Sequence, residues 1–169
     1  MTTATPVLIT SRPFCDEADF WRVRELLIDA YPLTPTGFNW EVRRWDGERF
    51  HNDDAALNPA WGHTVRLWET EDGQVVGVAH SDYKTNISLQ VHPDYRDLEA
   101  EMIEWGETTF AAEKDGQRLV EIMVFDYDVQ RQRLLTARGY ERTPYFWRAR
   151  RMRFGNHALP TAEIAPGYT

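Results

Sequence analysis

The stretch ISLQVHPDYRDLEAEMIEWGETTFAAE, residues Ile87–Glu113, decides the fold because its hydrophobic period changes along its length. The apolar run Ile87–Val91, which a proline ends, predicts a β-strand. From Asp97, an expected N-cap, apolar side chains recur at helical spacing and predict a long amphipathic helix. Asp115-Gly116 is expected to stop that helix.

The N-terminal part of the chain predicts one strand and two helices. Pro6–Arg12 is an apolar run suited to an edge strand. Asp16 is the expected N-cap of a helix that ends near Ala30–Tyr31, because Pro32 disfavours helix at the residue before it. Asn39–Phe50 predicts a second helix, with its first residue as the cap.

The middle of the chain predicts an antiparallel meander. His63–Glu69 and Gln74–Tyr83 have the period of strands, and Glu71-Asp72-Gly73 lies between them. An Asp-Gly pair tolerates the positive φ that a tight hairpin turn needs. With Ile87–Val91, these runs give three consecutive strands.

The C-terminal part predicts a parallel strand and another helix. Arg118–Tyr127 is apolar on both faces, as in a central strand covered on two sides. Asp128 is an expected cap of a helix that Gly139 closes, and Tyr140–Phe154 predicts one or two final strands. The order β-α-α-β-β-β-α-β-α-β(-β) predicts an α+β fold. We expect a mixed, mostly antiparallel six- to seven-stranded sheet flanked by about four helices.

Composition predicts a single domain, residues 1–154, followed by residues 155–169 as a tail or linker without periodicity. The net charge of −8 argues against nucleic-acid binding. A single cysteine, Cys15, excludes an intramolecular disulfide and is expected to be a packing residue. No secretion signal or membrane-length apolar run is present, so we expect a cytoplasmic protein that does not span a membrane.

Three stretches resemble the GNAT N-acetyltransferase superfamily, over roughly Val7–Phe154. The first is similar to the family's fourth strand and the pyrophosphate loop that follows it. The second is similar to the fifth strand, and the third to the fourth helix and the residues at its end. These stretches are LQVHPDYRD at Leu89–Asp97, RLVEIMVFDYD at Arg118–Asp128 and QRLLTARGYERT at Gln132–Thr143.

The resemblance implies a GNAT-like fold and an acetyl-CoA site. The acyl arm is expected between Leu89–Val91 and Val124–Tyr127, and the pyrophosphate at the helix N-terminus, where bare backbone N–H groups favour an anion. The residues that the resemblance implies as cofactor contacts are Leu89, Gln90, Val91, Arg96, Asp97, Leu98, Glu99, Ala100, Glu101 and Asp128.

The sequence departs from the family pattern in that loop. Arg96 matches its first position, but Glu99 and Glu101 stand where the family has glycine. A carboxylate ~4 Å from a phosphate charge costs about 4 kcal/mol at an effective dielectric constant of about 20. The same acids complement the helix dipole by about 0.3–1 kcal/mol each. Leu135 stands where many relatives carry a tyrosine that protonates the leaving thiolate.

A general base would be needed to deprotonate an amine nucleophile. His80 and Asp82 on the second strand of the meander, and Glu121 on the strand after the long helix, are candidates by position. The five histidines have no HxH or HExxH spacing, so no metal site is expected.

The function expected from the resemblance is acetyl transfer from acetyl-CoA to a small-molecule amine, bound over Tyr31–Trp40. The alternative is a catalytically degenerate GNAT domain that serves as structural partner or substrate wall for a catalytic domain, in a tandem protein or a homo-oligomer. Ala165–Thr169 resembles the lead-in to another GNAT domain, as in tandem proteins of the mycothiol-synthase type, which would make this chain the degenerate N-terminal half. A small-ligand-binding module without CoA is a third possibility.

Overall fold

The main sheet has the strand order β1-β2-β3-β4-β7, and every neighbouring pair is antiparallel except β4 and β7. A computed structural model describes residues 8–51, 57–82 and 85–145. The chain divides into two units, Met1–Gly139 and Tyr140–Thr169, and the described helices and strands lie in the first. The strands of the sheet are β1 (Ile9–Pro13), β2 (Val65–Thr70), β3 (Val75–His80), β4 (Asn86–Val91) and β7 (Glu121–Ile122).

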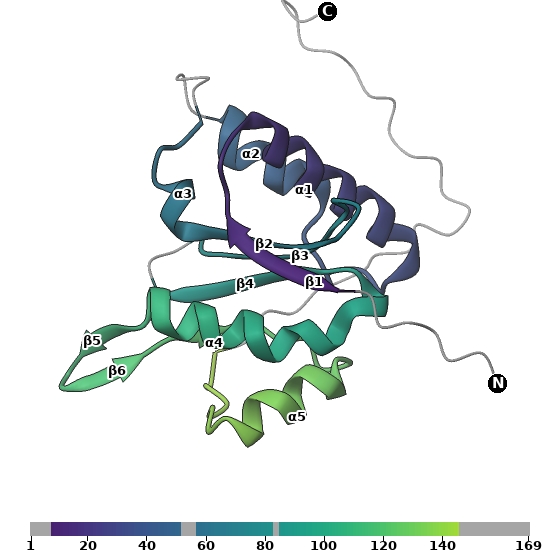
Figure 1. The fold of residues 1–169 in the computed structure, drawn as a ribbon. Coiled ribbons are helices and arrows are strands. Elements are labelled where there is room, and N and C mark those ends of the chain that lie inside the picture. The colour runs from purple at the N-terminus through teal and green to yellow at the C-terminus, as the bar shows by residue number, and fades with distance from the viewer. Residues whose placement is uncertain (1–7, 52–56, 83–84, 146–169) are drawn as a thin grey trace, which may run out of the picture. The chain divides into compact units, whose positions relative to one another are not determined.

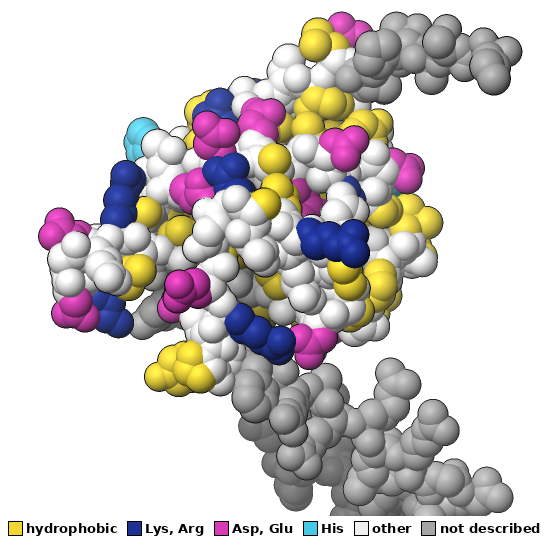
Figure 2. All heavy atoms as spheres, turned by 90° about the horizontal axis from the view of Figure 1, so that it is seen from below, with side chains coloured by type: hydrophobic (Ala, Val, Ile, Leu, Met, Phe, Trp, Pro, Cys, Tyr) yellow, Lys and Arg dark blue, Asp and Glu magenta, His cyan; other side chains and the backbone are white. Residues whose placement is uncertain are grey.

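Helices cover both faces of this sheet (Figure 1). Helices α1 and α2 lie over one face, and α4 and α5 lie over the other. The helical elements are α1 (Glu17–Ala30), η1 (Tyr31–Leu33), α2 (Val42–Phe50), α3 (Trp61–Thr64), η2 (Pro93–Leu98), α4 (Glu99–Phe110) and α5 (Val129–Ala137). On the face formed by α4 and α5, acidic and basic side chains are interspersed (Figure 2).

Several local sequence signals are confirmed. Asp16 caps α1 by accepting a hydrogen bond from the Asp19 N–H at 3.3 Å, and the helix ends at Ala30 as predicted. Gly73 has a φ of +84° in the hairpin turn between β2 and β3. Asp128 caps α5 by accepting from the Arg131 N–H at 3.1 Å. Each signal acts within a few residues, which is why sequence alone is sufficient to find it.

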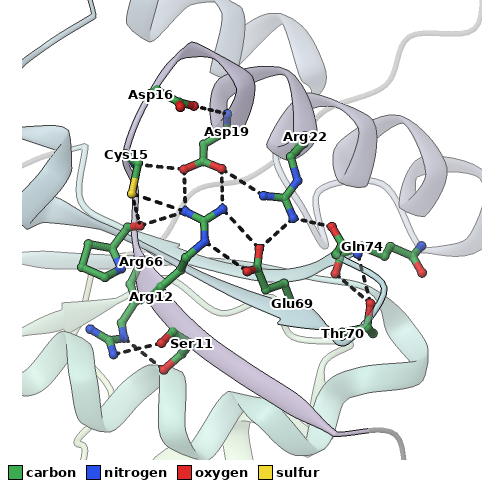
Figure 3. Close-up of polar contacts among 12 residues, drawn as sticks. Ser11, Arg12, Cys15, Asp16, Asp19, Arg22, Arg66, Glu69, Thr70 and Gln74 are labelled. Atoms are coloured by element: carbon green, nitrogen blue, oxygen red, sulfur yellow. Dashed lines mark hydrogen bonds and ion pairs between the residues drawn. The ribbon is translucent and has the colours of Figure 1, made fainter.

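A cluster of four charged residues fastens α1 to the edge of the sheet (Figure 3). The Arg12 guanidinium on β1 donates to both carboxylate oxygens of Asp19 on α1, each at 2.6 Å. Glu69 on β2 accepts from Arg12 at 3.1 Å and from Arg22 at 2.7 Å. The thiol of Cys15 beside this cluster is exposed, so the expectation that it packs in the core is wrong.

Both ends of the predicted long helix differ from expectation. Asp97 does not cap it, because the 3-10 turn η2 comes first and α4 begins at Glu99, after Leu98. The helix ends at Phe110, and Asp115 and Gly116 instead form a hairpin turn with φ values of 53° and 75°. That hairpin joins two strands paired only with each other, β5 (Ala112–Lys114) and β6 (Gln117–Leu119).

The run Arg118–Tyr127 is not a central strand in the part of the chain that the structure describes. Only Glu121–Ile122 pairs with β4, and the pairing is parallel, as predicted. Met123 is 55% exposed and Phe125 39% exposed, so the prediction of two covered faces is wrong. No strand is present in residues 140–145, and the rest of the predicted final strands and the predicted boundary after residue 154 lie outside the described residues.

Candidate functional site

The region that the resemblance assigns to acyl-CoA comprises Leu89–Val91, the first turn of α4 and Val124–Tyr127; we call it the cofactor region. The parallel ladder between β4 and β7 covers only Asn86–Ile87, so among the described residues the rest of β4 has no partner strand on that side. The His92 N–H donates to the Val76 carbonyl of β3 at 2.9 Å. Because backbone groups alternate along a strand, those of Leu89 and Val91 point away from β3, toward the cofactor region.

The backbone of Val91 is already paired with a side chain of this chain. The Asn39 Nδ2 donates to the Val91 carbonyl and the Val91 N–H donates to Asn39 Oδ1, both at 2.9 Å. Asn39 is buried, and α2 begins three residues later at Val42, so the prediction that Asn39 caps this helix is wrong. The side chain of Gln90 is also engaged, since its Oε1 accepts from the Trp40 N–H at 2.7 Å.

The first turn of α4 carries a buried charge network. Glu99, whose side chain is 1% exposed, accepts from Arg96 at 2.7 Å and from Arg131 Nε at 2.9 Å. Arg96 also donates to Asp128 at 2.7 Å. Burial acts to lower the pKa of Arg96, but its hydrogen bonds to Glu99 and Asp128 raise that pKa above its ordinary value. Two arginines and two carboxylates therefore neutralise one another where the pyrophosphate was expected.

The other residues of the predicted loop do not converge on one point. Glu101 accepts from the Trp68 Nε1 at 3.0 Å and from the Ser11 Oγ at 3.4 Å, so its carboxylate is directed to β1 and β2. Asp97 is exposed, whereas Leu98 and Ala100 are half-buried. The two glutamates that the resemblance aligns with glycines thus belong to separate contacts, and only Glu99 lies in the network with Arg96.

His80, the first candidate base, is a buried residue at the end of β3. Its Nε2 lies 3.1 Å from Gln90 Nε2, and the Trp40 ring meets the imidazole edge-on at 4.3 Å between ring centres. Because Gln90 Oε1 accepts from Trp40, the Gln90 amide nitrogen donates to a neutral His80. Burial lowers the pKa of His80 from 6.5 to about 4, with a smaller opposing effect of Asp82. A base this weak, with its Nε2 engaged, is poorly matched to deprotonating an ammonium group at neutral pH.

Glu121, the second candidate base, lies on the far side of β4 from His80. It is exposed on β7, where its N–H donates to the Thr85 carbonyl at 2.9 Å. The strand order places β4 between β3 and β7, so the fold does not bring His80 and Glu121 together. In the described part of the chain, no group of three or more His, Cys, Asp or Glu side chains is placed to hold a metal ion.

Sequence reasoning missed a surface hollow of about 310 Å³ beside the segment expected to bind an amine. Glu41 and Arg43 at its rim form an ion pair at 2.6 Å. Nothing in the sequence marked this hollow, because it depends on the packing of η1 and α2 against α1. Its lining residues are Leu27, Ile28, Tyr31, Glu41, Val42 and Arg43.

These contacts do not fit acetyl-CoA. A pyrophosphate at the start of α4 would meet the Glu99 carboxylate, and the arginines that would attract it already have carboxylate partners. An extended amide arm along β4 would find the Val91 backbone groups already paired with Asn39. Of the residues that cause this misfit, Glu99 was recognised from the sequence, Asn39 was expected only to cap a helix, and Arg131 was not singled out.

No protein-family model and no curated protein matches the sequence. A GCN5-related N-acetyltransferase from Sphaerobacter thermophilus aligns with 79% of this chain at 19% identity and a TM-score of 0.58, and the chain spans 43% of that protein. A proposed acetyltransferase from Acinetobacter baylyi ADP1 aligns with 81% of this chain and 80% of its own length, at 14% identity and a TM-score of 0.52. The chain therefore has the GNAT fold. Within the described residues, no helix is long and apolar enough to cross a membrane.

Proposed function

We propose that this chain is a GNAT-fold domain of an acyl-CoA-dependent N-acyltransferase system that does not itself bind the cofactor. In this role it is the packing partner or substrate wall of a catalytic GNAT domain. The observation that carries the proposal is Glu99, which stands at a glycine position of the pyrophosphate loop and is held between Arg96 and Arg131. In this arrangement the two arginines pair with Glu99 and stabilise the domain. In a cofactor site, the same positive charges would be available to bind phosphate.

The length relationship supports a tandem arrangement. The chain aligns with 43% of the Sphaerobacter thermophilus protein, which leaves more than half of that protein beyond it. We therefore propose that the catalytic partner is a second GNAT domain, in the same polypeptide or in another copy. The amine acceptor would then be a substrate of the partner domain.

The second candidate is an acetyltransferase that acts alone on a small-molecule amine, with cytoplasmic acetyl-CoA as donor. The parallel pairing of β4 with β7 favours it, because in the described residues this pairing ends at Ile87 and leaves Leu89–Val91 without a partner strand on the β7 side. This candidate requires two changes. The hydrogen bonds between Asn39 and Val91 must break, and the ion pairs of Glu99 with Arg96 and Arg131 must separate.

Calorimetric titration of the purified, folded chain with acetyl-CoA separates the two candidates. We expect no heat of binding up to high micromolar cofactor, and no thiol release when amines are supplied. A micromolar site would overturn the first proposal, and Glu99→Gly should then tighten binding. Glu104→Gln, a change of an exposed glutamate on the same helix, is the control that should alter nothing.

A further inference from the structure

The segment Thr36–Trp40, between η1 and α2, has contacts on three sides: with β4, with the two arginines that hold Glu99, and with Val124–Tyr127. Asn39 and Trp40 bond to Val91 and Gln90 on β4. Phe38 is buried. The guanidinium groups of Arg96 and Arg131 stand over its ring at 4.8 and 5.3 Å.

Val124–Tyr127, on the third side, is in contact with the first two residues of the segment. The Tyr127 hydroxyl donates to the Thr36 carbonyl at 3.2 Å. Gly37 has a φ of +87°, and a Cβ at this position would lie 2.5 Å from the Phe125 ring. Phe125 and Tyr127 stack on each other at 5.2 Å, so both rings close over the segment together.

Asn39 reproduces what an amide of an extended ligand would do. Its carboxamide presents one N–H donor and one C=O acceptor to the C=O and N–H of the same residue, Val91. This is the two-bond exchange that a strand residue makes with its hydrogen-bonded partner in an antiparallel ladder. Both bonds are buried. If Asn39 moved away, the N–H and C=O groups of Val91 would therefore lose their hydrogen-bond partners.

We propose that Thr36–Trp40 is a built-in occupant of the cofactor region and that Asn39 stands in for the amide of an extended ligand. Asn39 is thereby the residue that excludes amide-bearing ligands from β4. The inference deepens the proposed function and rests on it for the chemical class of the ligand, an acyl-carrying arm with successive amides. It is independent of the Glu99 network. That network opposes the binding of phosphate, whereas pairing along β4 concerns only the amides of a ligand.

Pantetheine is the probe, since it carries two amides and no phosphate and so does not meet Glu99. We expect millimolar pantetheine to leave the Leu89 and Val91 amide signals of the wild-type chain unmoved in ¹H–¹⁵N spectra. In Asn39→Ala and Asn39→Ser, the same titration should give saturable shifts at both signals. Binding by the wild-type chain, or no binding by either folded variant, would overturn the inference.

Hydrogen exchange tests the pairing of Val91 directly in the wild-type chain. The Val91 N–H should exchange at least tenfold more slowly than the same amide in a folded Asn39 variant, because in the part of the chain that the structure describes its partner on that side is Asn39 and not a strand. Rapid exchange of Val91 in the wild-type chain would overturn the inference even if both variants fail to fold. If the wild-type chain binds acetyl-CoA but the Val91 signal does not move, the proposed function is contradicted and the inference about Asn39 is not.

Discussion

The Arg12 guanidinium donates two parallel hydrogen bonds of 2.6 Å to the Asp19 carboxylate and so joins the first strand to the first helix (Figure 3). Asp19 also accepts from the Cys15 N–H at 2.9 Å, and Arg22 donates to it at 3.1 Å. A bidentate arginine–carboxylate pair fixes orientation as well as distance. The pair therefore sets how α1 sits on the edge of the sheet.

Asp19→Asn should destabilise the chain and remove part of its acid sensitivity. Burial acts to raise the pKa of Asp19, but hydrogen bonds from Arg12 and Cys15 and the nearby arginine charges hold that pKa below its ordinary value. A lowered pKa gives stability that is complete above the unfolded value, about 3.9, and is lost as pH falls further. Urea unfolding should show a loss of about 2–3 kcal/mol at pH 7 and a smaller one at pH 3.

Asp29→Asn is the matched control for this prediction, because Asp29 is exposed on the same helix. Its free energy of unfolding should stay within about 0.5 kcal/mol of the wild-type value at both pH values. An equal loss in the two variants would show that the Arg12 pairing contributes nothing specific.

Glu99→Gln should cost about 2–4 kcal/mol, because it leaves the buried Arg131 and the half-buried Arg96 with one carboxylate fewer. Thermal or urea unfolding measures the loss. Glu104→Gln, on the exposed face of α4, should be nearly neutral. If both substitutions are neutral, Glu99 is not held as the contacts indicate.

His80 should stay uncharged at neutral pH. Burial lowers its pKa from 6.5 to about 4, and the charge of Asp82 opposes this only in part. The unfolded chain therefore binds a proton that the folded chain does not, and stability should fall as pH drops from about 6.5 toward 4, by roughly 3 kcal/mol over the full window. His80→Gln should flatten this slope in urea titrations between pH 4.5 and 6.5, and an unchanged slope would contradict the assignment.

Gly37→Ala should be much more damaging than Gly139→Ala, although both glycines have a φ of +87°. At Gly139 nothing lies within 4 Å of the added Cβ, so only the backbone penalty of about 1–2 kcal/mol is expected. At Gly37 the Cβ would meet the Phe125 ring at 2.5 Å, which adds roughly 1–3 kcal/mol of overpacking. Adding Phe125→Ala to Gly37→Ala should recover part of the lost free energy; without recovery, the ring contact is not the cause.

The sequence was a reliable guide wherever the information lies within one turn or one pair of strands. The Asp16 and Asp128 caps, the Gly73 hairpin and the parallel pairing after the long helix are all present in the structure. The resemblance to GNAT proteins also gave the correct fold. The sequence also located the first turn of α4, although that turn begins one residue later than expected, with Leu98 in place of Asp97 as the N-cap.

Errors arose where a residue suited to a local role is used by a distant part of the chain. Asn39 has the right side chain to cap a helix, but Val91, 52 residues away, takes both of its hydrogen-bonding groups. Asp115-Gly116 is a plausible helix stop and is equally suited to a hairpin turn. The chain uses it for the hairpin, because the helix has already ended at Phe110.

By itself, the sequence of this protein determined the GNAT-like order of strands and helices and the presence of Glu99 and Glu101 at the start of the long helix, because hydrophobic period and residue identity are properties of neighbouring residues. Only the tertiary structure decided what those glutamates do: Glu99 is buried between two arginines, and Glu101 faces Trp68 instead. It also decided that the backbone of Val91 is paired with Asn39. The physical reason is that hydrogen bonds and ion pairs between distant segments form only once the fold has brought those segments together.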